Sequence, residues 1–173
     1  KQGNYRSAID NYLKALKIQE SLNSKIGSAD AYNNIGALYE KLDAYDQAIK
    51  NYHKALVLYV EIGNKQKSGL VLHNLGYIQS LLKNYEKALE FYEKSLEIRN
   101  EYGDKQGVAS TLINIGGILE KKGELKKAKE LIATCETDLS LLDNAVHSLT
   151  LKILHTFPNC TMKTISEVRK FKL

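Results

Sequence analysis

The 173-residue sequence contains a single proline, Pro158, and no tryptophan. Proline interrupts helices, so its absence from residues 1–157 leaves room for long, unbroken helices. No stretch approaches the roughly 18 consecutive apolar residues that a membrane-spanning helix needs, and no signal segment is visible. With 43% hydrophobic and 26% charged residues, the composition is typical of a soluble globular domain.

Cysteine is also scarce. Cys135 and Cys160 form no C-x-x-C pair and have no histidine cluster beside them, so neither a metal site nor a disulfide framework is expected. The expected compartment is therefore the reducing cytoplasm. The short motifs of nucleotide-binding loops, zinc proteases and serine hydrolases are absent from the sequence. We expect no catalytic residues, no metal and no cofactor, and so a protein that is not an enzyme.

The net charge of +5 is unevenly distributed. Residues 145–173 contain five lysines and arginines against one acidic residue, Glu167, which leaves +4 in this segment. The preceding 144 residues are close to neutral. A basic face along the main body is not supported, and we expect no nucleic-acid partner.

The strongest positive signal is a repeat of 40 residues. Four residue types recur at this spacing: Gly36, Gly76 and Gly116; Ala8, Ala48, Ala88 and Ala128; Tyr12, Tyr52 and Tyr92; and Asn34, Asn74 and Asn114. Within a repeat, apolar residues follow helical spacing from Tyr32 to Leu42 and again from Tyr45 to Leu56. Each repeat is therefore predicted to be two amphipathic helices joined by a short turn.

The boundaries between repeats have residues that end one helix and begin the next. Gly103 can adopt the left-handed conformation that closes a helix, and the side chain of Asp104 can cap the following one. The pairs Gly63–Asn64 and Asn23–Ser24 stand in the same register. Small residues such as Gly36 would let paired helices approach closely, with the tyrosines filling the core. The alternative for the tyrosines, a stacking platform for nucleic-acid bases, would need exposed rings.

This pattern resembles the tetratricopeptide repeat. One copy places a large-large-Gly-large motif on its first helix and an Ala-large-Ala motif on its second, at Tyr32, Ile35, Gly36, Tyr39, Ala48, Tyr52 and Ala55. The usual period is about 34 residues. The longer period here is similar to that of the repeats in kinesin light chains and spindle-orientation adaptors. The phrases "EIGNKQ" and "HNLG" look most like bacterial members. The resemblance implies an all-α, right-handed superhelical solenoid of antiparallel helix hairpins.

The register divides the chain into repeats over residues 1–143 and a different segment over 144–173. Residues 1–23 are predicted to be the second helix of a truncated repeat, followed by full repeats at 24–63, 64–103 and 104–143, with about seven long helices in all. A solenoid helix without its partner exposes apolar surface, so at least one further helix is expected upstream. Residues 144–173 are expected to form a degenerate capping helix and a basic tail.

The resemblance implies that the first helices of the repeats line a concave groove for a partner. Carried over by position, the groove comprises Asn33, Asn34, Leu70, His73, Asn74, Tyr77, Leu81, Ile113 and Asn114. The asparagines could hold the backbone of an extended peptide, because an amide both donates and accepts hydrogen bonds. The alternative is that each asparagine bonds to a neighbouring helix and orders the stack. The apolar groove centre suggests an amphipathic or hydrophobic ligand segment.

The predicted function is a protein-interaction scaffold that binds a peptide or helical segment of a protein partner in this groove. The alternative is a sensory or regulatory segment of a larger bacterial signalling protein, with a kinase, cyclase or transcription-regulator domain elsewhere. Nothing in these 173 residues supplies such output chemistry. RNA binding would require basic and aromatic groove residues that the sequence lacks.

Overall fold

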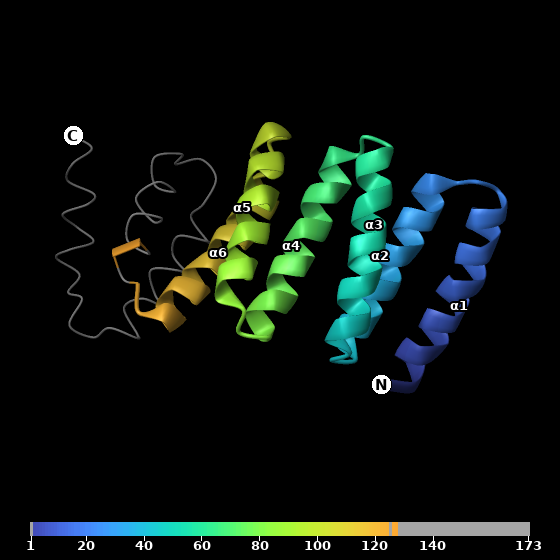
Figure 1. The fold of residues 1–173 in the computed structure, drawn as a ribbon, viewed down its shortest axis with the longest axis horizontal. Coiled ribbons are helices and arrows are strands. Elements are labelled where there is room, and N and C mark those ends of the chain that lie inside the picture. The colour runs from blue at the N-terminus through green and yellow to red at the C-terminus, as the bar shows by residue number, and fades with distance from the viewer. Residues whose placement is uncertain (1, 125, 128–173) are drawn as a thin grey trace. The chain divides into compact units, whose positions relative to one another are not determined.

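The computed structural model describes residues 2–124 and 126–127 (Figure 1). These residues form helices and turns and contain no strand. The helices are α1 (Gln2–Ser21), α2 (Lys25–Lys41), α3 (Tyr45–Glu61), α4 (Lys65–Leu81), α5 (Tyr85–Glu101) and α6 (Lys105–Lys122). The predicted all-helical fold is confirmed. The helix predicted to follow α6, and the capping helix and tail over 144–173, lie outside the described residues.

The chain forms two compact units, residues 1–103 and 104–173. In the first unit each helix packs against the next one in the chain, from α1 through to α5 (Figure 1). The pairs α2–α3 and α4–α5 are the antiparallel hairpins that the 40-residue spacing predicts. The second unit contributes α6 to the described part of the chain.

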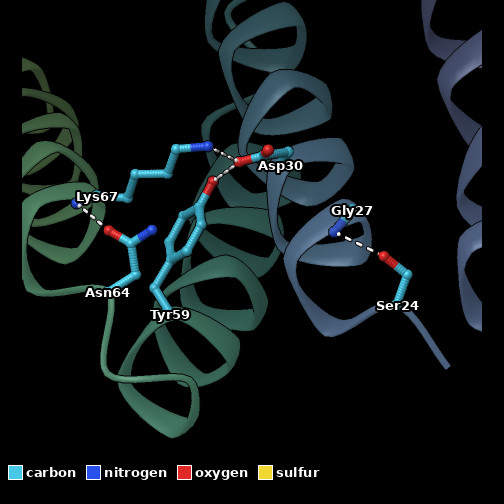
Figure 2. Close-up of polar contacts among 6 residues, drawn as sticks. All are labelled: Ser24, Gly27, Asp30, Tyr59, Asn64 and Lys67. Carbon is cyan, nitrogen blue, oxygen red and sulfur yellow. Dashed lines mark hydrogen bonds and ion pairs between the residues drawn. The ribbon is translucent and has the colours of Figure 1, made fainter.

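The starts of α2, α4 and α6 are capped as the sequence predicts. The side chains of Ser24, Asn64 and Asp104 accept hydrogen bonds from the backbone N–H three residues later, at 3.3, 3.1 and 2.9 Å (Figure 2 shows the first two). The residue before each cap is left-handed, with φ of 52°, 70° and 64° in turn. These caps satisfy donors that the first turn of a helix leaves without partners, and they set where each repeat begins.

Each hairpin of the first unit is held together by a tyrosine lying on a glycine. The rings of Tyr52 and Tyr92 are at most 1% exposed, and a Cβ atom added at Gly36 or Gly76 would lie 2.8 Å from them. The prediction that these tyrosines form the core is confirmed. Tyr12 has the same register on α1 but is 37% exposed. The prediction is wrong there, because no described helix brings a matching glycine against that ring.

Candidate partner-binding surface

Helix α4 exposes a strip of large side chains along one face. Leu70, Asn74, Tyr77 and Leu81 follow the i, i+4, i+7, i+11 spacing that places residues on one side of a helix. Leu70, Tyr77 and Leu81 are 43%, 39% and 43% exposed, and Asn74 is half-buried. We call these four residues the α4 strip. It offers apolar surface with one amide at its middle.

The corresponding faces of the other first helices are polar. In register with the α4 strip, α2 has Asp30, Asn34, Ala37 and Lys41. In the second unit, α6 has Ser110, Asn114, Gly117 and Lys121 at these positions. Both predicted groove residues of α6, Ile113 and Asn114, are half-buried. Among the described first helices, α4 alone has an apolar row at these positions.

Asp30 is held by two partners from later helices. The Tyr59 hydroxyl on α3 donates a hydrogen bond to Asp30 Oδ1, and Lys67 Nζ on α4 forms an ion pair with the same oxygen (Figure 2). The lysine ammonium also lies 5.6 Å from the centroid of the Tyr59 ring. Burial, followed by the contact with Asp30, raises the pKa of Tyr59 above its ordinary value. The contacts tie α2, α3 and α4 together beside the α4 strip.

These partners of Asp30, which stands in register with Leu70, were not identified from the sequence. A signal was present, because the position of Lys67 is occupied by Gly27 and Gly107 in the neighbouring repeats. The position of Asp30 itself is occupied by Leu70 and Ser110. An acid and a base that both depart from the repeat pattern are candidates for a pair.

The predicted asparagines differ in their surroundings. The Asn74 side chain hydrogen-bonds the Tyr52 hydroxyl, which itself donates to Glu40 Oε2 at 2.9 Å. Part of the hydrogen-bonding capacity of Asn74 is therefore used within the fold, as the stack-ordering alternative expects. Asn34 is half-buried, and so is Asn33, whose Oδ1 is buried without a partner among the described residues.

His73 is half-buried and packs toward α5. Its ring lies 5.4 Å from that of Tyr92, with a tilt of 56° between the planes. Burial, and secondarily the positive charge of Arg99, lowers the pKa of His73 to about 4. The imidazole is therefore neutral near neutral pH and adds no positive charge to the groove.

Over the described residues, no three His, Cys, Asp or Glu side chains gather as they would to hold a metal ion. None of the helices described is long and apolar enough to cross a membrane.

The family model described as "Tetratricopeptide repeat" matches residues 1–59, 27–101 and 67–136. The chain belongs to the tetratricopeptide repeat family. The resemblance stated from the sequence is thereby confirmed. Tetratricopeptide repeats generally mediate protein–protein interaction, and such repeat scaffolds are typically non-catalytic.

Solved structures show the same tetratricopeptide fold. BtubC (BKLC) from P. vanneervenii matches with a TM-score of 0.73 at 21% identity, over 98% of this chain and 75% of that one. A putative kinesin light chain from Podosopora anserina with nearly identical TPR-like repeats also scores 0.73, at 12% identity, over 97% and 85% of the two chains. At these identities the likeness concerns the fold alone.

Two curated proteins share a short segment with this tetratricopeptide chain. Both are 6-oxocyclohex-1-ene-1-carbonyl-CoA hydrolases. The one from Thauera aromatica is 52% identical over 50 residues, which is 29% of this chain and 13% of that protein. The one from Geobacter metallireducens is 46% identical over 54 residues, which is 31% and 12%. The chain thus spans only about an eighth of these relatives.

Proposed function

We propose that the protein is a non-catalytic scaffold that binds an amphipathic or apolar segment of a partner protein on the α4 strip. The observation that carries the proposal is the exposure of Leu70, Tyr77 and Leu81 in one row, where the neighbouring repeats have polar or small residues. Exposed apolar rows on helices mark interaction surfaces, because covering them removes apolar area from water.

The surroundings of the strip support an apolar rather than a charged ligand. Both acids of α2 already have partners: Asp30 has Lys67 and Tyr59, and Glu40 accepts from the Tyr52 hydroxyl. His73, one residue before Asn74, is neutral because its pKa is lowered to about 4. In the strip, the half-buried Asn74 comes between Leu70 and Tyr77. Its amide forms one hydrogen bond with Tyr52, and its remaining donor and acceptor groups would bond the backbone of a ligand segment.

The finer parts of this function remain predictions. They are the role of the asparagines, the groove residues of α6, the cytoplasmic setting and the absence of nucleic-acid and cofactor partners. A regulatory segment of a larger bacterial signalling protein would use the same strip to bind its regulator.

The test replaces the three apolar residues of the α4 strip with residues found at the equivalent positions of the neighbouring repeats. The variant Leu70→Ser/Tyr77→Ala/Leu81→Lys has at each position the residue found in register on α6 or α2, so the helix is expected to fold. Peptides selected from a random library on the unchanged protein should carry apolar residues at helical or alternating spacing. Three lost contacts of about 1 kcal/mol each predict roughly 100-fold weaker binding to the variant.

The control is Val60→Asn, an exposed position on α3 that has Asn100 in register. It should bind the selected peptides as the unchanged protein does. If the triple variant binds them equally well while circular dichroism shows it folded, the α4 strip is not the interaction surface.

A further inference from the structure

A cavity of about 600 Å³ lies between the end of α1, the first two turns of α2 and the middle of α3. Its lining includes Glu20, Lys25, Tyr32, Lys54, Val57 and Leu58. Tyr32 lies two residues before Asn34, the α2 counterpart of Asn74. At about 100° per residue, these two side chains leave α2 on nearly opposite sides. The cavity is therefore separate from the α4 strip.

The cavity lining includes an aromatic ring, that of Tyr32, which a hydrogen bond holds in place. The Tyr32 hydroxyl donates to Glu20 Oε1 at 3.0 Å, which fixes the ring between α1 and α2. Val57 on α3 is 56% exposed, and the half-buried Leu58 follows it. A ring with two aliphatic side chains forms a surface suited to a large apolar group.

The cavity lining also includes two lysines, which differ in their ion pairs. Lys25 Nζ is paired with Glu61 Oε2 at 3.1 Å. Lys54 Nζ, by contrast, lies 4.9 Å from the centroid of the Tyr32 ring and has no ion pair within the described part of the chain. An ammonium group over an aromatic face, beside apolar surface, is well placed to receive a carboxylate.

The next repeat offers an internal comparison. Forty residues on, Lys54 is matched by Lys94, but His53 and Val57 are matched by Glu93 and Glu97. The equivalent surface of α5 therefore carries two acids around its lysine, which would repel an anionic ligand. On α3 these acids are missing. The first site therefore combines an apolar surface with a lysine that has no ion pair among the described residues, while the one acid in the cavity lining, Glu20 on α1, accepts the hydrogen bond of the Tyr32 hydroxyl.

We propose that this cavity binds a short peptide segment of a partner protein that carries a large aliphatic side chain followed by Asp or Glu. The aliphatic group would pack on Tyr32, Val57 and Leu58, and the acid would pair with Lys54. A volume of about 600 Å³ is enough for one such side chain and its flanking backbone. The site adds to the proposed function and does not depend on the α4 strip.

Backbone amide NMR titrations of the full chain test the site with two probes. They are the capped tetrapeptides acetyl-Gly-Leu-Asp-Gly-amide and acetyl-Gly-Leu-Asn-Gly-amide. Both should bind at millimolar concentration and shift the amides of Tyr32, Val57 and Leu58, leaving Leu70 and Tyr77 unmoved. The aspartate probe should bind about threefold tighter, the size expected for an exposed ion pair.

Two variants assign the contacts. Lys54→Gln should abolish the preference for the aspartate probe without weakening the asparagine probe. Val57→Glu, the residue found at position 97, should weaken both probes at least about tenfold, the loss of roughly one buried apolar contact. Lys94→Gln is the matched control, since it removes the equivalent lysine of the next repeat, and it should change neither affinity.

Three results would overturn the proposal. One is the absence of binding at millimolar concentrations, or shifts confined to the α4 strip. Another is equal affinity of the unchanged protein for the two tetrapeptides. The third is binding of the free acid 4-methylpentanoate as tight as that of the aspartate tetrapeptide, which would assign the cavity to a small carboxylic acid.

Discussion

The ring of Tyr52 on α3 lies so close to Gly36 on α2 that a methyl group at the glycine would come within 2.8 Å of ring carbon Cδ1. The same relation holds between Tyr92 and Gly76, at 2.8 Å. Because the tyrosines are buried and packed on all sides, they cannot move aside. The glycine is therefore what permits this spacing of the two helices in each hairpin.

The first prediction is that Gly36→Ala destabilises the protein. Overpacking a filled core costs about 1–3 kcal/mol. The better helix propensity of alanine offsets about 1 kcal/mol of this cost. A net loss of up to about 2 kcal/mol should appear as a lower urea midpoint.

The matched control for that variant is Gly117→Ala on α6. It makes the same change inside a helix, but no atom of the described residues lies within 4 Å of the added methyl group. It should raise stability by up to about 1 kcal/mol. Equal effects of the two substitutions would show that the contact between residue 36 and Tyr52 does not set the packing.

Most of the fold followed from the sequence because it is repeated and local. Periodicity sets which residues share a helix face, and the caps at Ser24, Asn64 and Asp104 depend on residues only three positions apart. Contacts between repeats were not predictable in this way. Lys67 meets Asp30 across 37 positions of sequence, and neither residue follows the repeat pattern.

The candidate site was less predictable than the fold. The sequence identified the positions of Leu70, Tyr77 and Leu81 on one face of a helix, but not their exposure. Nor could it show that His73 packs toward Tyr92 or that Asn74 bonds Tyr52. Side-chain direction depends on the space left by neighbouring helices, which a register alone does not give.

The second prediction concerns the bond that joins α2 and α3. Tyr59→Phe keeps the buried ring and removes only the hydroxyl that donates to Asp30. Losing a hydrogen bond to a charged group typically lowers the free energy of unfolding by about 1.5–3 kcal/mol. The loss should be smaller here, because Asp30 keeps its contacts with water and with Lys67. Urea denaturation followed by circular dichroism measures the change.

Tyr102→Phe is the control, because it removes a hydroxyl from a side chain that is 52% exposed. It should change the free energy of unfolding by no more than about 0.5 kcal/mol. If Tyr59→Phe changes the free energy of unfolding as little as Tyr102→Phe does, the bond to Asp30 does not stabilise the fold.

The third prediction is that His73 makes the fold sensitive to acid. Its pKa is lowered from 6.5 to about 4 by burial and by Arg99, so between these values the unfolded chain binds a proton that the folded chain does not. The free energy of unfolding should therefore fall as pH drops from about 6.5 toward 4, by at most about 3 kcal/mol. Denaturant midpoints measured across this range test the slope.

His73→Gln should flatten that pH dependence. The imidazole signals of His73 in an NMR pH titration should also move below pH 5. A titration of His73 near its ordinary pKa of 6.5 would contradict the prediction.

The last prediction separates the two roles open to the groove asparagines. Asn74→Ala removes an amide that bonds the Tyr52 hydroxyl, so it should lower stability by about 1 kcal/mol. In a Tyr52→Phe background this loss should largely disappear, because the pair is already broken. Asn34→Ala and Asn100→Ala, at a half-buried and an exposed position, provide comparisons on α2 and α5.

A ligand-binding role of the asparagines also predicts how the same variants bind peptides. If the amides also hold a ligand backbone, Asn34→Ala and Asn74→Ala should each weaken the peptides selected on the unchanged protein by about fivefold per folded molecule, the value of one hydrogen bond of about 1 kcal/mol. If stability falls and affinity does not, the asparagines order the stack, and binding on the α4 strip depends on its apolar residues.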